Sequence, residues 1–270
     1  MTTLNKFSNL LNLLTYFSNE EKCLDYLEEI RWNGSLKCVY KNCDGEKIFR
    51  CKNHKYKCAK CKQVYSVKVG TIFEGSKLPL QKWFAGIYLI TSHKKGISSL
   101  QLGRDLSITQ KSAWFLLHRV RFSLGLQATE NKLKGIIEAD ETFMGGEEKN
   151  KHKNKRTEGT QGRSVKTKTA VAGVIERGGE LRAKKVNTTQ GYHLKPFVIK
   201  NVEFGSKLMT DEWWGYKGLS ALFKHQFVKH NEGEYVVSDC HTNSLEGFWS
   251  LLKRGVDGIY HSVSTKHLQQ

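Results

Sequence analysis

Four cysteines in two close pairs constrain the fold of this chain more than any other feature. Cys38 and Cys43 enclose four residues, and Cys58 and Cys61 enclose two. Two tight turns with these spacings supply the four thiolates that a tetrahedral zinc ion takes. The Lys and Gly residues around the pairs would make a poor apolar core, which disfavours four incidental buried thiols. We therefore predict a small zinc-stabilised domain over residues 36–74.

The other cysteines and one histidine affect the prediction of which four side chains bind the zinc ion. Cys51 and His54 lie between the two pairs, and either could replace one ligand. Cys23 and Cys240 are better interpreted as buried hydrophobic residues. Seven is an odd number of cysteines, which favours metal binding in a reducing compartment over a set of disulfides. Such a zinc ion stabilises a domain that has too few apolar residues to fold unaided, and it catalyses nothing.

The net charge of the chain indicates which kind of molecule it binds. The 270 residues include 44 Lys and Arg against 26 Asp and Glu, a formal net charge of +18. A polyanion is therefore expected, with nucleic acid as the first candidate and a membrane surface as the second. The sequence has no apolar run of about 18 residues, so we predict no membrane-spanning helix. Acids and polar residues interrupt the first thirty positions where a signal peptide needs apolar ones, so we expect an intracellular protein, in the cytoplasm or nucleoid of a bacterium or the nucleus of a eukaryote.

Helical periodicity dominates the first half outside the cysteine region. Residues 1–35 are predicted to form a helical segment, in which Asn19 caps a helix over 19–31. Residues 79–126 divide into three helical parts; Pro79 opens the first, and Ser107 is the predicted cap of the third.

A short helix, a tight turn and a longer basic helix are typical of a helix-turn-helix. We assign this interpretation to residues 77–128, with an ordinary three-helix bundle as the alternative. The helix-turn-helix interpretation makes Lys111, Arg119 and Arg121 candidate DNA contacts.

The second half alternates between strand and helix patterns. Residues 135–146 form an apolar β-rich run ending in acids, and Gly178-Gly179 marks the turn of a hairpin. A helix is predicted near 191–202, a strand within 206–214 and an amphipathic helix at 241–255, whereas 216–238 has no clear pattern. This order predicts an α/β domain with a mixed sheet over residues 133–270.

Residues 149–168 form a basic loop between the first strand and the hairpin. The segment holds eight Lys or Arg and one acid, and we predict that it is mobile. A solvated charge run is the usual explanation for such a segment, and a loop that contacts phosphates is the alternative. The candidate DNA contacts here are Lys151, Lys153, Lys155 and Arg156.

Three acids form the second chemical pattern. Asp140 and Asp211 each end a predicted apolar strand, and Glu246 lies on the last helix. Carboxylates at adjacent strand ends, with a third from a helix, can hold two divalent ions for in-line phosphoryl transfer. Taken singly, each acid could instead be a strand-end cap or a solvated helix residue. Other acids that could take one of these roles are Glu138, Glu141, Glu212 and Asp239.

The last helix places an acid and a cation on one edge. At about 100° per residue, Glu246 and Lys253 differ by only about 20° around the helix. The apolar stripe on another side consists of Leu245, Phe248, Trp249 and Leu252. We therefore predict a helix that packs through its stripe and offers Glu246 to a metal and Lys253 to a DNA phosphate, with Arg254 as a further DNA contact.

Six blocks in order carry a resemblance that covers nearly the whole chain. They read "EEKCLDYLEEIRWNG", "YKCAKCKQVYSVKVGTIFEGSKLPLQKWF", "KKGISSLQLGRDLSITQKSAWFLLHRVR", "EADETFMGG", "TDEWWGY" and "HTNSLEGFWSLLKRG". The chain resembles insertion-sequence transposases that join an N-terminal zinc ribbon to a DDE-type catalytic domain, the bacterial relatives of Merlin elements. The resemblance implies a ribonuclease-H-like fold, Mg²⁺ or Mn²⁺ in the catalytic site, and Zn²⁺ in the ribbon.

Residue roles follow from the same resemblance. Asp140, Asp211 and Glu246 would be the catalytic acids and Lys253 the trailing basic residue, whereas Asn243 is a weaker candidate for the third role. The zinc ligands would be Cys38, Cys43, Cys58 and Cys61. The implied partners are double-stranded DNA, as terminal inverted repeats and as target, and further copies of the chain assembled on it.

Two departures from the family pattern accompany the resemblance. The first cysteine pair is spaced more widely than the family's usual two-residue gap, and the chain stops at "STKHLQQ", where similar proteins continue. We expect a C-terminally truncated DNA transposase that cleaves and joins strands. The alternatives are a non-catalytic DNA-binding protein derived from a transposase and a nuclease without strand transfer.

Overall fold

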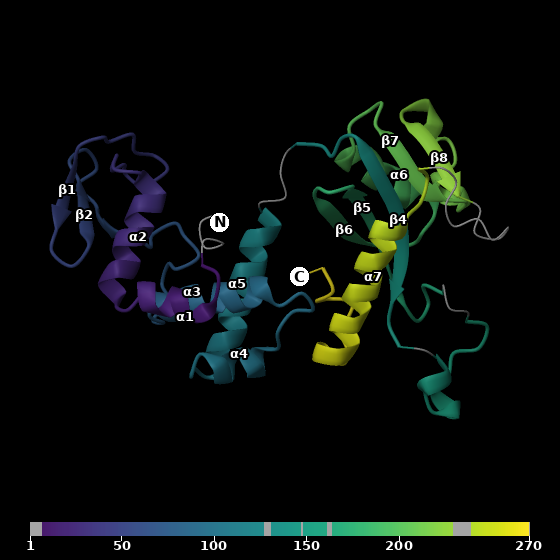
Figure 1. Cartoon of the computed structure of the whole chain (residues 1–270), viewed down its shortest axis with the longest axis horizontal. Coiled ribbons are helices and arrows are strands. Elements are labelled where there is room, and N and C mark those ends of the chain that lie inside the picture. The colour runs from purple at the N-terminus through teal and green to yellow at the C-terminus, as the bar shows by residue number, and fades with distance from the viewer. Residues whose placement is uncertain (1–6, 127–130, 147, 161–163, 229–238, 270) are drawn as a thin grey trace. The chain divides into compact units, whose positions relative to one another are not determined.

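The computed structural model describes residues 7–126, 131–146, 148–160, 164–228 and 239–269 (Figure 1). The chain separates into two compact units, Met1–Gly125 and Leu126–Gln270. No helix in the described part of the chain is both long enough and apolar enough to cross a membrane.

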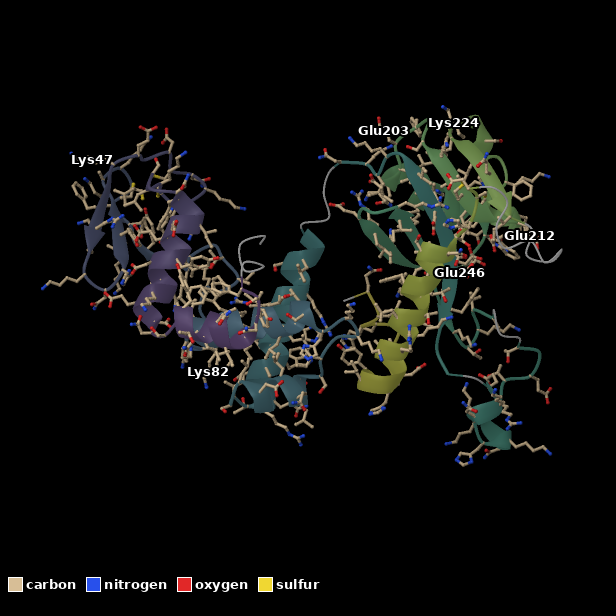
Figure 2. The ribbon with its side chains drawn as sticks, in the orientation of Figure 1. Lys47, Lys82, Glu203, Glu212, Lys224 and Glu246 are labelled. Atoms are coloured by element: carbon tan, nitrogen blue, oxygen red, sulfur yellow. The ribbon has the colours of Figure 1, made fainter. Side chains whose placement is uncertain are left out.

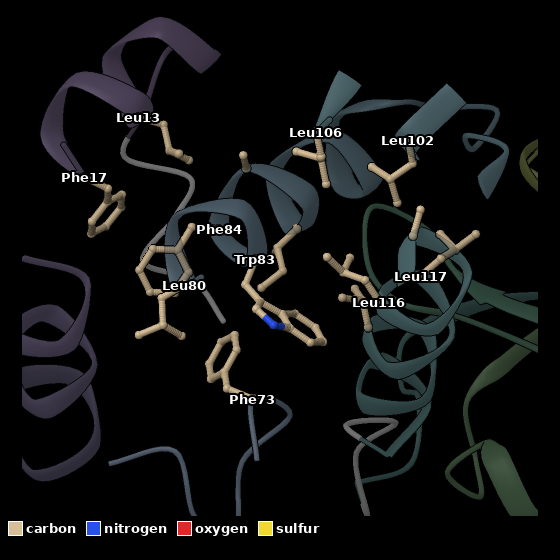
Figure 3. Close-up of a cluster of buried hydrophobic side chains, with 14 of the residues drawn as sticks. Leu13, Phe17, Phe73, Leu80, Trp83, Phe84, Leu102, Leu106, Leu116 and Leu117 are labelled. Atoms are coloured by element: carbon tan, nitrogen blue, oxygen red, sulfur yellow. The ribbon is translucent and has the colours of Figure 1, made fainter. Parts of the chain in front are cut away.

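The first unit is mainly helical. Asn9 and Asn19 cap its first two helices by accepting the backbone N–H groups of Asn12 and Lys22. Apolar side chains of all five helices meet in one core, in which Trp83 lies among leucines and phenylalanines (Figure 3). The helices are α1 (Leu10–Tyr16), α2 (Glu20–Trp32), α3 (Leu80–Ser92), α4 (Ser99–Asp105) and α5 (Gln110–Leu126). The helices predicted over 19–31 and within 79–126 are therefore confirmed.

The predicted cap of α5 is wrong by two residues. Thr109, not Ser107, precedes the helix, and its Oγ1 accepts the N–H of Ser112 at 3.2 Å. Ser107 instead takes a left-handed conformation with φ of 50° in the turn between α4 and α5. That conformation ends α4 and turns the chain, so the side chain that caps α5 comes later.

A three-stranded antiparallel sheet completes the first unit. It has the order β1-β2-β3 and consists of β1 (Ile48–Cys51), β2 (Lys55–Cys58) and β3 (Val64–Ser66). Trp32 at the end of α2 packs on Tyr56 and Tyr65 of this sheet. Glu28 of α2 also accepts the Tyr56 hydroxyl. Because α2 reaches both this sheet and the helical core, it joins the two parts into one unit.

The second unit is an α/β domain with a mixed five-stranded sheet in the order β6-β5-β4-β7-β8. β4 pairs antiparallel with β5 and parallel with β7, whereas β5–β6 is antiparallel and β7–β8 parallel. The strands are β4 (Ile136–Met144), β5 (Thr169–Glu176), β6 (Leu181–Val186), β7 (Lys207–Asp211) and β8 (Lys224–Val228). This confirms the predicted fold class, a mixed-sheet α/β domain of the ribonuclease-H-like kind.

Two helices cover opposite faces of this sheet (Figure 1). α6 (Gly191–Asn201) packs through Leu194 and Val198 on one face. α7 (Asn243–Gly255) packs through Leu245 and Trp249 on the other. Because β4 lies in the middle of the sheet, its alternate side chains point to α6 and to α7.

One strand has no counterpart in the prediction. β8 (Lys224–Val228) lies within the segment 216–238, which has no clear sequence pattern. Its side chains do not alternate by polarity: Phe227 is 52% exposed, while its neighbour Val228 is buried. Periodicity therefore cannot reveal it. Residues 229–238 of the same segment lie outside the described residues.

The basic loop contains local structure in its described part. It forms two short 3₁₀ turns, Glu148–Asn150 and Lys153–Lys155. The Arg156 guanidinium donates to the carbonyls of Lys149 at 2.7 Å and Lys151 at 3.0 Å. Its predicted mobility stays a prediction.

Candidate functional site

The four predicted zinc ligands meet at one point. The Sγ atoms of Cys38, Cys43, Cys58 and Cys61 all lie within 4.8 Å of one another. Cys38–Cys61 and Cys43–Cys58 are both 3.7 Å apart. A regular tetrahedron with Zn–S bonds of about 2.3 Å has edges of about 3.8 Å, so these separations fit zinc.

Cys51 does not join the cluster. It is exposed at the end of β1, and His54 faces Asp25 of α2 at 3.8 Å. Neither replaces a ligand in the group of four cysteines.

Two of the four cysteines have strongly shifted pKa values. Backbone N–H groups of Cys61 and Lys60 lower the pKa of Cys58 to about 7, whereas burial raises that of Cys38 to about 12. Hydrogen bonds with the neighbouring thiols add to both shifts, raising the pKa of Cys38 and lowering that of Cys58. Gly45 also fits closely, since a Cβ there would lie 2.5 Å from the Cys58 sulfur.

The acidic residues lie on two neighbouring strands and the helix that covers them. β4 and β7 are parallel and pair Glu138 with Met209. Two residues further along both strands, Asp140 and Asp211 therefore lie side by side and point toward α7. Figure 2 labels Glu246 where α7 passes beside β4. Asp140, Asp211 and Glu246 line one cavity of about 500 Å³. The full set of lining residues is Asp140, Glu141, Thr142, Asp211, Thr242, Glu246, Trp249, Ser250 and Lys253.

Asp140 lies in the interior of β4, not at its end as predicted. β4 continues to Met144 because β5 pairs with it along that length, with Asp140 opposite Gly173. Burial, followed by the negative charge of Asp211, raises the pKa of Asp140 to about 7. A carboxyl with such a pKa, partly buried in a cleft among other carboxylates, is a candidate for binding a cation.

An indole orients the Asp140 carboxylate. Trp249 Nε1 donates to Asp140 Oδ2 at 3.0 Å. The ring reaches this position because Gly173 has no side chain; a Cβ there would lie 2.6 Å from the Trp249 ring. The sequence assigned Trp249 only to the apolar stripe, although its N–H is a donor that a buried indole usually satisfies.

Separate contacts orient the other two acids. Thr242 Oγ1, only 1% exposed as a residue, donates to Glu246 Oε1 at 2.9 Å. The backbone N–H of Trp213 donates to Asp211 Oδ1 at 3.0 Å. Thr242 is a second residue that sequence reasoning missed, because it carries no charge and precedes the helix.

Of the other candidate acids, Glu141 also lines the cavity, whereas Glu138, Glu212 and Asp239 do not. Glu138 is fully buried and bonded to α7, and Glu141 accepts the hydroxyl of buried Tyr216 at 2.8 Å. Asp239 pairs with Arg177 at 2.8 Å. Glu212 is not among the cavity-lining residues.

Asn243, the weaker candidate for the third acid, is also placed away from the cavity. It is the exposed first residue of α7 and does not line the cavity, whereas Glu246 and Lys253 do. The structure thus brings together the two aspartates, Glu246 and Lys253.

The candidate DNA contacts of the first unit differ in their exposure and in their hydrogen bonds. Lys111 is exposed in the first turn of α5, and Arg121 is partly exposed. Arg119 instead donates to the carbonyls of Ile72 at 2.8 Å and Glu74 at 2.7 Å. Its guanidinium therefore ties α5 to the segment that follows the small sheet.

The basic candidates of the second unit also divide. Lys153 and Lys155 are exposed, and Lys151 forms an ion pair with Glu148 at 2.5 Å. Arg156 is bonded to its own loop. On α7, exposed Arg254 donates through Nε to the Ser250 carbonyl at 3.2 Å.

Comparison with known proteins identifies both units. The model of the ISXO2-like transposase domain matches residues 132–270, which is more than half of the chain. The chain belongs to the ISXO2-like transposase family. A transposase zinc-ribbon domain also matches residues 18–64, in agreement with the cysteine cluster.

A relative from an insertion element supports this assignment. An "uncharacterized protein in transposable element ISH50" of Halobacterium salinarum is 27% identical over 251 residues, which cover 88% of this chain and 83% of the relative. Family membership confirms the resemblance found in the sequence. It gives the chain a transposase-related role that involves DNA, and the ribbon with its four cysteines supports structural zinc.

Proposed function

We propose that the chain is a DNA transposase that binds the ends of its element and catalyses metal-dependent strand cleavage and strand transfer. The observation that carries the proposal is the cavity in the second unit. Asp140, Asp211 and Glu246 line it with the cation Lys253. Three carboxylates for metal and an ammonium group for phosphate are the elements of phosphoryl-transfer chemistry.

The donor set fits Mg²⁺ or Mn²⁺, which prefer oxygen ligands. The cavity of about 500 Å³ leaves room for water and substrate phosphate as further ligands. When bound, two such ions activate the attacking oxygen and stabilise the leaving one. The raised pKa of Asp140 fits the same assignment, because a cation would relieve the repulsion from Asp211.

Each step uses residues of this chain to hold the reacting groups. Trp249 and Thr242 keep the carboxylates of Asp140 and Glu246 in place, and Lys253 binds a phosphate oxygen of the scissile region. Water attacks the phosphodiester, the bond from phosphorus to O3′ breaks, and a 3′ hydroxyl is released. That hydroxyl then attacks a phosphodiester of target DNA, whose own O3′ leaves as the new bond forms.

The first unit supplies DNA binding in this proposal. α4 and α5, joined through the turn at Ser107, correspond to a helix-turn-helix with α5 as the helix that enters the major groove. Lys111 and Trp114 are both exposed in its first turns, and Trp114 is 52% exposed. The zinc ribbon adds a basic surface, and paired element ends would bring two or more copies together.

Strand transfer of labelled element ends in Mg²⁺ tests the proposal. Asp140→Asn and Asp211→Asn should each lower cleavage by more than about 100-fold, the upper end of losses seen for residues that only support metal ligands. Asp257→Asn is the matched control, because Asp257 is exposed and follows α7. Unchanged cleavage in both site variants would refute the catalytic assignment. Salt-sensitive DNA binding without any cleavage by the wild type would favour the non-catalytic DNA-binding protein instead.

A further inference from the structure

Glu138 is a fully buried acid that the proposed chemistry does not use. It lies on β4 two residues before Asp140 and is 0% exposed. Its Oε1 accepts Arg177 Nε at 2.7 Å and Ser244 Oγ at 2.9 Å. Its Oε2 accepts the backbone N–H groups of Ser244 at 2.9 Å and Leu245 at 3.1 Å. A charge buried this deeply persists only when such donors compensate it.

These contacts make Glu138 the cap of α7. The residue before the helix, Thr242, makes no capping hydrogen bond, because its hydroxyl donates to Glu246. The first N–H groups of a helix need acceptors and carry partial positive charge. Glu138 meets both needs from another element, through the amides of Ser244 and Leu245, which directly precede Glu246.

Arg177 holds the segment that leads into α7. It follows β5, and its Nη1 donates to Asp239 Oδ1 at 2.8 Å. Its Nη2 donates to the carbonyls of Asp239 at 2.9 Å and His241 at 3.1 Å. One guanidinium therefore joins the Glu138 carboxylate to the backbone just before the helix, in the fork geometry that Lys cannot reproduce.

We propose that Glu138 and Arg177 form a positioning pair that fixes Glu246 relative to Asp140. Glu138 and Asp140 are on the same face of one strand, so the strand that carries the first acid also anchors the helix that carries the third. A helix is rigid over one turn, so fixing Ser244 and Leu245 fixes Glu246. This inference rests on the proposed function, in which both acids hold metal.

Conservative substitutions separate positioning from folding. In Glu138→Gln one oxygen becomes an NH₂ group, which places a donor against either Arg177 or the amides of α7. Arg177→Lys keeps the charge but loses the fork. Arg182→Lys is the matched control: the two side chains are 18% and 12% exposed, and Arg182 bonds to the Asn131 carbonyl at 2.6 Å, away from α7.

The experiment measures the full-length zinc-loaded protein in three ways. Mn²⁺ binding is titrated by calorimetry without DNA, hydrogen exchange is followed in peptides from the start of α7, and cleavage of labelled ends gives kcat and KM. We expect Arg177→Lys and Glu138→Gln to weaken Mn²⁺ binding by about 10- to 100-fold, as outer partners of metal ligands do. Exchange at residues 243–246 should accelerate, and kcat should fall with little change in KM for DNA.

The control decides what the result means. Arg182→Lys should lower thermal stability about as much as Arg177→Lys does. It should nevertheless leave the Mn²⁺ affinity and the hydrogen exchange at the start of α7 unchanged. The inference is overturned if Arg177→Lys binds Mn²⁺ as the wild type does, or if both arginine variants weaken it equally. Failure of the proposed function has a different signature, because wild-type protein would then bind Mn²⁺ without cleaving DNA.

Discussion

Asp140→Asn should stabilise the protein in the absence of Mg²⁺ and Mn²⁺. In the folded chain, burial and the neighbouring carboxylates of Asp211 and Glu246 raise the pKa of Asp140 from 3.8 to about 7. An acid whose pKa is raised by folding contributes stability below its unfolded pKa and loses it as the pH rises through the folded pKa. Wild-type stability should therefore fall between about pH 4 and pH 7. Asn imitates the protonated carboxyl and should not show this fall.

The magnitude follows from the shift. From 3.8 to about 7 is about 3 pKa units, and each is about 1.4 kcal/mol, so the variant should exceed the wild type by up to about 4 kcal/mol above pH 7. Near pH 4 the two should be equally stable. Added Mn²⁺ should stabilise the wild type, because a ligand that binds only the folded state raises the free energy of unfolding. It should have little effect on the stability of the variant.

Hydrogen exchange of peptides from β4, followed against urea at pH 5 to 8, measures this difference in the full zinc-loaded chain. Asp257→Asn removes the same charge at an exposed position of the same unit and should change stability by less than about 0.5 kcal/mol. Equal or lower stability of Asp140→Asn at pH 8 would refute the raised pKa of Asp140.

Three further substitutions test close contacts. Trp249→Phe keeps a ring but removes the N–H that bonds Asp140, so Mn²⁺ affinity by calorimetry should fall about 10-fold; unchanged affinity would mean that the indole does not orient the carboxylate. Gly173→Ala places a methyl group 2.6 Å from the Trp249 ring and should lower the free energy of unfolding in urea by about 1–3 kcal/mol; unchanged stability would contradict the close packing of the indole on Gly173. Gly45→Ala places a methyl group 2.5 Å from the Cys58 sulfur, so metal analysis should find less zinc bound to this variant than to the wild type. Full zinc content would contradict the tight packing of the cluster.

Local signals accounted for most of the elements. Asn19 caps α2, and the cysteine spacings predicted a cluster that the structure brings within 4.8 Å. These patterns act over a few residues, so one stretch of sequence contains the whole cause. Two errors arose where a neighbouring element decides: β8 exists because it pairs with β7, and β4 extends past Asp140 because β5 continues beside it.

The site could be predicted only as a set of residue types. The sequence indicated Asp140, Asp211, Glu246 and Lys253, which line one cavity. It did not indicate which side chains hold them. Trp249 lies 109 positions from Asp140, and Leu245 lies 107 from Glu138. Neither pairing has a local pattern, so only the fold reveals them.

β4 separates a structural acid from a candidate functional one. Its face toward α7 carries Glu138, which is fully buried, and Asp140, which is partly buried at the cavity. Acids removed from water on a central strand are costly unless their charges are compensated. Glu138 is compensated by Arg177 and by the amides of α7. Asp140 has hydrogen-bond donors but faces other carboxylates, and its pKa is correspondingly raised. This difference in compensation makes Glu138 a structural acid and leaves Asp140 as the candidate for binding a cation.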